Sequence, residues 1–399
     1  MPSIVSALAG VRILDLTRVV AGPYATGLLA ELGARVVKVE QPEIGDEVRR
    51  LPDQVRGVSL TFNDLNRNKE GITLDLRHPT GRALLLELLP HFDVLAENFA
   101  AGRMREWGLD WPVIRAANPR IVFASLSGYG QDGPHSARPS YDNTSQAVSG
   151  LMALTGESDG PPTKAGTNLA DYVGGLFLAV AILAALRGRD ASGTGARIDL
   201  SNQDALFTML DSYPLWYRAS GKEATRNGNR HRVAAPFGSF LARDGWVVLS
   251  AGSRGLLRRA LRMIGREALL DEPDFRERVK RFTARDELNG LFEEFVATRT
   301  RAELERCCAE HRVGYAPVQT VAELSRDPQL AHRQMFREVA HPDGQEPIPT
   351  RGLAIRIEEM PAQIRTRAPM LGEHTGSVLA ELLGVDEAAL AELRARGAV

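Results

Sequence analysis

The chain has 399 residues, 44% hydrophobic and 25% charged, which is enough for two or three domains with buried cores. Its 49 Lys and Arg residues are balanced by 50 Asp and Glu residues, and a net charge of −1 gives no electrostatic basis for binding nucleic acid or an anionic membrane. The longest apolar stretch, residues 176–186, is shorter than the roughly 18 residues of a membrane span and predicts a buried core helix. The two cysteines, Cys307 and Cys308, are adjacent, which excludes a disulfide framework; because no signal-like segment is found at the N-terminus, we expect a cytoplasmic protein.

The first forty residues alternate between strand and helix patterns. Residues 11–16 and 34–40 predict strands, and residues 24–32 between them predict a helix that ends before Gly33. This succession with short connections predicts a parallel sheet covered by helices. The alternation continues with expected strands at 72–76, 94–98 and 121–126, helices at 80–89 and 170–187, and a strand or helix start at 197–200.

The composition changes at residues 222–231, a Gly-, Asn- and Arg-containing segment typical of a linker. Beyond it, residues 238–250 predict a hairpin and residues 256–310 predict helices. The expected domains are a Rossmann-like α/β domain with a parallel sheet over residues 1–220, a smaller α+β domain over 225–320, and a C-terminal segment, 321–399, that returns to the large domain.

Several common catalytic motifs are missing from the sequence. The turn at residues 18–24 has one glycine where a dinucleotide-binding turn has three, and Pro23 removes a backbone donor for a pyrophosphate, which disfavours nicotinamide or flavin binding. The sequence contains neither a phosphate-binding loop nor the nucleophile elbow of a serine hydrolase. The eight histidines are scattered without metal-ligand spacing, so we expect no metal site.

Asp171 lies at the start of the most apolar predicted helix, immediately before Tyr172. The simplest interpretation is an N-cap, whose carboxylate accepts hydrogen bonds from the first backbone N–H groups. The same position also suits a nucleophile, because those donors favour the ionised carboxylate. Gly174 and Gly175 leave the backbone bare, so that a thioester could approach and its oxyanion could meet an N–H group. The two interpretations are compatible.

A series of short segments shares its order and spacing with a known family. These segments are residues 8–16, 21–23, 32–40, 45–46, 65–69, 97–99, 128–134, 141–142, 170–171 and 371–375. Through them the chain resembles the class III CoA-transferase family, also called CaiB/BaiF, over nearly its whole length. The resemblance implies that Asp171 is the nucleophile and that the fold is an interlocked homodimer of ring-like protomers. It also implies an acyl-CoA and a small carboxylic acid as partners, with coenzyme A as a substrate and no permanently bound cofactor.

The resemblance assigns contacts with CoA to two segments. The matching residues are Asn66, Arg67, Lys69, Asn98 and Phe99. The first three match a segment along the nucleotide part of CoA, and the last two match one that flanks the pantetheine and the adenine. Many relatives have an arginine eight positions beyond the asparagine of the second segment, where this chain has Glu106. Arg103 and Arg105 stand nearby, and one of them is expected to meet a phosphate.

The expected acyl pocket departs from two groups of relatives. Racemases acting on α-methylacyl-CoA have a histidine at the position of Tyr141, and tyrosine is a poor base near neutral pH. Formyl-CoA:oxalate transferases have a glutamine at the position of Val20, so the wall at Val20 and Ala21 is expected to suit acids larger than oxalate or formate. The chain is therefore predicted to transfer CoA from an acyl-CoA, for example succinyl-CoA, to a carboxylic acid through an aspartyl anhydride and an aspartyl-CoA thioester. A racemase-type isomerase and a non-catalytic CoA-binding subunit are the alternatives.

Overall fold

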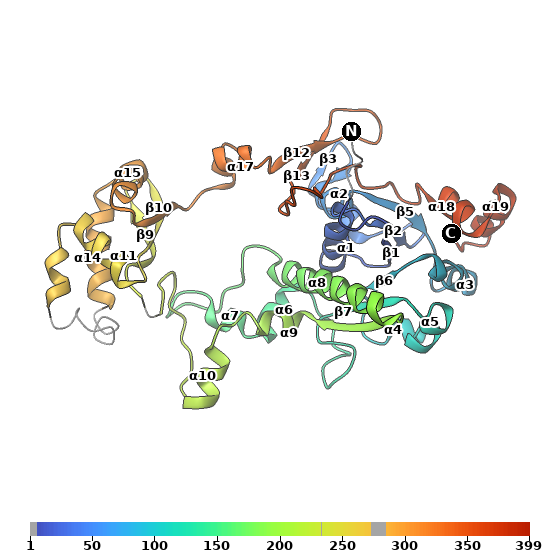
Figure 1. The fold of residues 1–399 in the computed structure, drawn as a ribbon, viewed down its shortest axis with the longest axis horizontal. Coiled ribbons are helices and arrows are strands. Elements are labelled where there is room, and N and C mark those ends of the chain that lie inside the picture. Colours follow the sequence, from blue (N-terminus) through green and yellow to red (C-terminus); the bar gives the residue numbers. More distant parts are fainter. Residues whose placement is uncertain (1–5, 233, 273–284) are drawn as a thin grey trace. The chain divides into compact units, whose positions relative to one another are not determined.

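The structure is a computed structural model that describes residues 6–232, 234–272 and 285–399. They fold into two compact units (Figure 1). Unit 1 holds residues from the segments 1–151, 164–215 and 328–399, and unit 2 holds residues from 152–163 and 216–327. Residues 328–399 therefore belong to the same unit as the N-terminal part of the chain, as predicted for the C-terminal segment. Residues 216–220 and 321–327 belong to unit 2, which corrects the predicted domain boundaries.

A parallel sheet of six strands forms the centre of unit 1, in the order β5-β2-β1-β6-β7-β8. Its strands are β1 (Arg12–Asp15), β2 (Arg35–Glu40), β5 (Lys69–Thr73), β6 (Val94–Glu97), β7 (Val122–Ser127) and β8 (Ala196–Ser201). The chain order reverses between β1 and β6, and doubly wound sheets bind ligands at such a reversal, beyond the carboxyl ends of the strands. The predicted parallel α/β sheet is confirmed. One strand is shifted: β5 begins at Lys69 instead of residue 72, because its pairing with β2 starts there.

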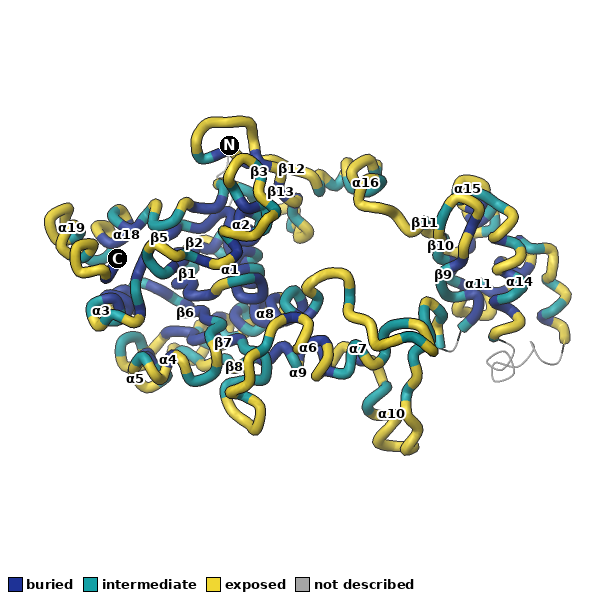
Figure 2. The backbone as a smooth tube through the Cα atoms, turned by 180° about the vertical axis from the view of Figure 1, so that it is seen from behind, coloured by how far each residue is buried: buried dark blue, intermediate teal, exposed yellow. Residues whose placement is uncertain are grey.

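Helices cover both faces of this sheet. On one face α1 (Ala21–Glu31) packs against α8 (Leu169–Ser192), and on the other lie α3 (Pro79–Leu88), α5 (Trp111–Ala117) and α18 (Thr375–Leu383). Successive side chains of a strand point to opposite faces, so Ile13 of β1 packs with the first pair of helices and Leu14 with the second group. The central strands β1, β2 and β6 are buried along most of their length (Figure 2).

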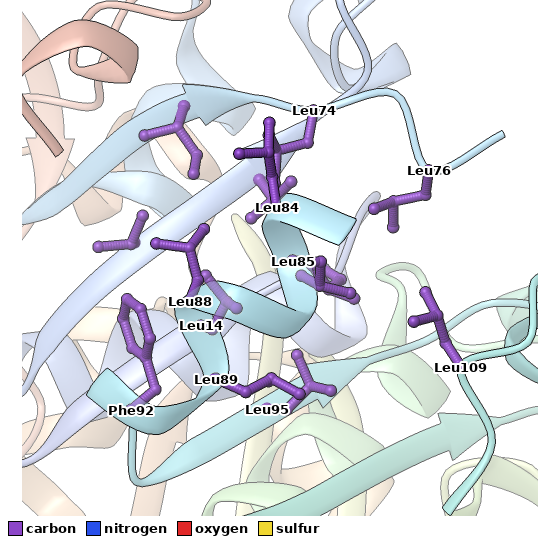
Figure 3. Close-up of a cluster of buried hydrophobic side chains, with 14 of the residues drawn as sticks. Leu14, Leu74, Leu76, Leu84, Leu85, Leu88, Leu89, Phe92, Leu95 and Leu109 are labelled. Atoms are coloured by element: carbon purple, nitrogen blue, oxygen red, sulfur yellow. The ribbon is translucent and has the colours of Figure 1, made fainter. Parts of the chain in front are cut away.

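The core beneath α3 is rich in leucine (Figure 3). Leu84, Leu85 and Leu88 of α3 belong to one buried cluster with Leu14 of β1 and Leu95 of β6. Burying a leucine side chain stabilises a fold by about 2 kcal/mol. This packing fixes β1 and β6 side by side, and their carboxyl ends lead into the segments that form the candidate site.

Among the described helices, α8 is long and apolar enough to cross a membrane, judged by length and composition alone. This corrects the expectation that no apolar stretch of the chain reaches the length of a membrane span. Core helices of soluble proteins pass the same test. Leu178 and Ile182 of α8 are fully buried against the sheet, as predicted for a core helix. Leu176, Phe177 and Val180 of the same helix are exposed.

Shorter elements complete the description of unit 1. They include α2 (Leu60–Asn66), α4 (Arg103–Glu106), α6 (Asp142–Val148), α9 (Asn202–Phe207), α17 (Pro328–His332), α19 (Glu387–Ala395) and the strand pairs β3 (Gln54–Val55) with β4 (Val58–Ser59) and β12 (Phe336–Val339) with β13 (Ile348–Arg351). Two helices lie where the chain passes between the units: α7 (Leu151–Leu154) and α10 (Tyr213–Ser220).

Unit 2 combines an antiparallel sheet with helices. The sheet has the order β11-β10-β9. Its elements are β9 (Phe237–Ala242), β10 (Gly245–Ser250), β11 (Gly314–Pro317), α11 (Arg254–Met263), α14 (Arg285–Ala297), α15 (Arg301–His311) and α16 (Val321–Leu324). Strands β9 and β10 confirm the predicted hairpin. Residues 152–163, expected in the large domain, belong to unit 2 because hydrogen bonds hold them there: Gly228 N donates to Gly156 O at 3.0 Å, and the Arg226 guanidinium donates to Gly160 O at 2.6 Å.

Candidate active site

Asp171 is the third residue of α8, so the predicted N-cap role is wrong. The helix begins at Leu169, and its N-cap residue is Asn168. The capping carboxylate comes from another helix: Asp142, the first residue of α6, accepts a hydrogen bond on Oδ1 from Ala170 N at 2.8 Å. The Asp171 carboxylate is therefore left available for chemistry.

The environment of Asp171 also corrects its expected ionisation. Burial raises the pKa of Asp171 to about 7, and the neighbouring carboxylate of Asp142 raises it as well. Asn202 acts in the opposite direction, since its Nδ2 lies 3.5 Å from Asp171 Oδ1 and favours the ionised form. Desolvation and a like charge thus outweigh the hydrogen bond from Asn202, and the pKa of Asp171 lies well above the ordinary range of a carboxyl group.

Gly174 and Gly175 have a packing role that the sequence did not indicate. A Cβ atom at Gly174 would lie 2.0 Å from Asn202 Oδ1, and one at Gly175 would lie 2.5 Å from Ala21 O. Neither glycine is among the residues that line the cavity at Asp171. The two glycines therefore let α8 approach α1 and Asn202 closely, which corrects the expectation that they leave the backbone open to a thioester.

Asp171 lines a cavity of about 220 Å³. The segments that follow β1, β6 and β8 and the end of β7 contribute its walls, so it lies where the strand order reverses. Several predicted site residues line it together with the nucleophile: Val20, Ala21, Asn98, Phe99 and Tyr141. Val20 is buried and gives this wall the apolar character expected from the sequence.

A second cavity of about 270 Å³ adjoins the first. Arg18, Phe99 and Ala100 line both cavities. The second one also has Arg103 and Arg77 in its lining. Carboxylates line it as well, and Arg77 forms an ion pair with one of them, Asp75, at 2.8 Å. The shared residues connect this cavity of mixed charge with the one at Asp171.

The structure separates the two arginines that the sequence left as alternatives. Arg103 lines the second cavity and forms an ion pair with Glu106 at 2.7 Å, with both side chains about half exposed. Arg105 lines a different cavity, together with Glu97, and contributes to neither of the two that meet at Phe99.

Asn66, Arg67 and Lys69 line neither of these two cavities. All three are buried. Arg67 Nε donates to Glu31 Oε1 at 3.0 Å, and Lys69 Nζ donates to Asp15 Oδ2 and to Asn66 Oδ1, both at 2.9 Å. Their charges are thus compensated inside unit 1. This segment is neither a solvated loop nor, in its placement here, a surface for CoA.

The turn between β1 and α1 is held by side chains from three other segments of the chain. Val19 has a φ of 67°, a left-handed conformation that β-branched residues rarely adopt. Its N–H donates to both carboxylate oxygens of Asp46 at 3.2 Å, and Lys38 Nζ bonds the same carboxylate at 3.1 Å. Asn98 binds the backbone of Arg18 twice: Arg18 N donates to Oδ1 and Nδ2 donates to Arg18 O, both at 2.8 Å. The amide of Asn98 is therefore used to position the turn that carries Val20.

Replacing Asn98 by alanine is expected to lower kcat by ten- to a hundredfold, because two hydrogen bonds of about 0.5–1.5 kcal/mol each hold the cavity wall. Steady-state kinetics with an acyl-CoA donor measures this. Asn118→Ala is the matched control, since Asn118 Nδ2 also bonds two backbone carbonyls, those of Leu89 and Phe92, away from the cavity. The control should lose stability and keep its kcat. A direct CoA contact at Asn98 would instead raise KM for the acyl-CoA and leave kcat unchanged.

The sequence did not single out four of the lining or neighbouring residues: Arg18, Arg138, Asp142 and Asn202. Arg18 and Asp142 lie in or next to segments that resemble the family, so a local signal existed for them. Asn202 begins α9, 31 residues after Asp171, and reaches it only because β8 ends beside α8. No local pattern indicates a contact of that kind.

Comparison with known proteins identifies the family. The model of CoA-transferase family III matches residues 8–375. The chain is 36% identical to the β subunit of succinyl-CoA–L-malate CoA-transferase from Chloroflexus aurantiacus over 394 residues, covering 98% of this chain and 97% of the relative. It is 35% identical to succinyl-CoA:glutarate CoA-transferase from Mus musculus over 397 residues, covering 98% and 90%.

A solved structure supports the same assignment. The crystal structure of a CaiB/BaiF family protein from Brucella suis superposes with a TM-score of 0.82 at 34% identity, covering 94% of this chain and 99% of that one. The resemblance inferred from short segments is thus confirmed over the whole chain. The protein is a CoA-transferase and belongs to CoA-transferase family III.

Proposed function

We propose that this enzyme moves CoA from succinyl-CoA to a second carboxylic acid, with Asp171 as the covalent nucleophile. The observation that carries the proposal is the position of Asp171: its carboxylate is not needed to cap α8, and it lines a cavity at the reversal of strand order. Succinyl-CoA is favoured as the donor because the relatives from Chloroflexus aurantiacus and Mus musculus are named for it.

The chemistry proceeds by staged acyl transfer. Ionised Asp171 attacks the thioester carbonyl, the C–S bond breaks, and sulfur leaves with its electron pair as CoA thiolate, which gives a mixed anhydride. The thiolate attacks the Asp171 carbonyl, the C–O bond to succinate breaks, and an aspartyl-CoA thioester remains. The acceptor carboxylate displaces the thiolate to form a new anhydride. The thiolate then attacks the acceptor carbonyl, which releases the new acyl-CoA and the Asp171 carboxylate.

The second cavity is proposed to hold the nucleotide part of CoA. Guanidinium groups suit phosphates because they can donate two parallel hydrogen bonds, and Arg77 and Arg103 line this cavity. Arg18, Phe99 and Ala100 line both cavities, so the pantetheine would pass them to bring its thioester to Asp171. Arg103, and not Arg105, is thus the proposed phosphate contact.

A homodimer is proposed as the working form. The exposed residues Leu176, Phe177 and Val180 lie on α8, the helix that carries Asp171, and exposed apolar side chains grouped in this way are typical of a surface that a partner covers. A second copy of this chain is the proposed partner, consistent with the interlocked dimer implied by the family resemblance. Sedimentation at low micromolar concentration should show a dimer, and a stable folded monomer would contradict it.

The proposed activity is tested by incubating purified protein with succinyl-CoA and a panel of carboxylic acids, and measuring the new acyl-CoA by mass spectrometry. Hydroxylamine added to enzyme that has been incubated with succinyl-CoA alone should convert Asp171 to its hydroxamate, which peptide mapping locates. Modification at another carboxylate, or none while transfer continues, would remove Asp171 from the covalent role.

A further inference from the structure

One arginine that lines the cavity at Asp171 has no charge partner among the described residues, and its side chain is exposed to solvent. Among its described lining residues, the lysine and arginine side chains are those of Arg18 and Arg138. Arg18 lies 3.5 Å from Glu47 and also lines the second cavity, which suits a role toward CoA. Arg138 lines only the first of the two cavities, and its guanidinium has no ion pair or hydrogen bond with the residues that the structure describes.

The segment that carries Arg138 is fixed close to the nucleophile. Ser140 Oγ lies 3.0 Å from Ser145 Oγ, and Gly128 makes room for Ser140, since a Cβ at Gly128 would lie 2.1 Å from that of Ser140. Asp142, two residues later, is bonded to the start of α8. Four residues of extended chain span at most about 14 Å. This upper limit agrees with the placement of Arg138 and Asp171 in the lining of one cavity.

A carboxylate is the natural partner for an unpaired guanidinium, because the two groups can form parallel hydrogen bonds. The reacting acid uses one carboxyl group at Asp171. A dicarboxylic acid has a second carboxylate left to pair with Arg138, whereas a monocarboxylic acid leaves the guanidinium unpaired. The positive charge also offsets the repulsion between a dianion and the carboxylates of Asp171 and Asp142.

We propose that Arg138 selects dicarboxylic acids by binding the carboxylate that does not react. The inference rests on the CoA transfer proposed above and adds its substrate class. The acyl group of the donor and the acceptor acid occupy the Asp171 cavity in turn, since both form the anhydride with the same carboxylate. Arg138 therefore acts on both sides of the reaction, and the enzyme exchanges CoA between two dicarboxylic acids.

The test compares glutarate with valerate, which have the same number of carbon atoms, as acceptors from one donor, succinyl-CoA. A hydrogen-bonded charge pair at a solvent-exposed arginine predicts a kcat/KM ratio of about two to ten in favour of glutarate. Arg138→Gln should bring this ratio close to one by lowering kcat/KM for glutarate and leaving that for valerate unchanged. Arg138→Lys should restore part of it, because the charge remains without the bidentate geometry.

Two further measurements make the result decisive. Arg115→Gln, at an exposed position of α5 that lines neither cavity, should keep the ratio of the unmodified enzyme. Binding of glutarate and valerate to the Asp171→Asn protein, with and without Arg138→Gln, gives a calorimetric readout that does not need turnover. Transfer that continues with the same ratio after Arg138→Gln, or glutarate binding that is unaffected by it, would overturn the role of Arg138. Absence of transfer combined with Arg138-dependent glutarate binding would instead refute the proposed function and keep the carboxylate site.

Discussion

Asp171→Asn is expected to abolish CoA transfer, with a loss of at least a thousandfold in kcat, because an amide cannot form the anhydride. In the unmodified enzyme, kcat/KM for succinyl-CoA should fall about tenfold per pH unit below the pKa of Asp171, which lies at about 7. The protonated carboxyl group is not a nucleophile, so activity is lost on the acid side. A pH profile of kcat/KM measures this, and a profile that is flat between pH 5 and 8 would contradict it.

The same substitution is expected to stabilise the fold at alkaline pH. Burial raises the pKa of Asp171 from 3.8 to about 7, so between these values the native state binds more protons than the unfolded state. The stability of the unmodified protein therefore falls as pH rises through this window, and asparagine removes the dependence. The difference in unfolding free energy should grow with pH and reach on the order of 2–4 kcal/mol at pH 8.

Chemical denaturation at pH 5 and pH 8 tests this sign. Asp159→Asn, at an exposed position in unit 2, is the matched control and should show no such difference between the two pH values. Loss of an N-cap would have the opposite effect, a destabilisation of about 1 kcal/mol. The sign of the change in unfolding free energy thus distinguishes two kinds of carboxylate. A capping carboxylate stabilises the fold, whereas a nucleophile that is buried without a charge partner destabilises it when ionised.

The sheet could be predicted because its determinants are local. Apolar runs mark β1 and β7, Gly33 marks the end of the first helical pattern, and short connections favour parallel pairing. The prediction for β5 missed its first residues because Lys69 and Glu70 are charged, and charged residues obscure the apolar pattern of a strand. Lys69 is nevertheless buried, because Asp15, the last residue of β1, compensates its charge.

The site could be predicted only in part, because its fine structure depends on contacts between distant segments. The position of Asp171 at the start of a helix was visible, but the helix boundary lies two residues earlier and Asp142 supplies the cap. A local argument from the helix dipole gave the wrong direction for the pKa of Asp171, since burial and Asp142 follow from packing. Likewise, sequence alone does not distinguish Gly174 as a packing residue from a glycine open to substrate.

Lys69→Met is expected to destabilise unit 1 by about 3–5 kcal/mol, because it leaves a buried carboxylate without its charge partner. The side chains of Lys69 and Asp15 are fully buried, with Nζ 2.9 Å from Oδ2. Nζ also donates to Thr26 Oγ1 at 2.8 Å and to Pro23 O at 3.1 Å. Methionine keeps the length and most of the volume of lysine, so the measured change in unfolding free energy reports the lost charge and hydrogen bonds, not a cavity.

Two comparisons give this measurement its meaning. Glu106→Gln breaks the exposed ion pair with Arg103 and should change stability by no more than about 1 kcal/mol. Asp15→Asn combined with Lys69→Met should be less destabilising than the sum of the two single changes, because the double variant leaves no uncompensated charge.

A Lys69→Met protein as stable as the Glu106→Gln protein, but with a strongly raised KM for the acyl-CoA, would instead show that Lys69 binds CoA, as the family resemblance implies. We expect the loss of stability, because Lys69 belongs to a buried network with Asp15 and Thr26. The hydrogen bonds of its ammonium group lie in the core, at the base of the turn that carries Val20.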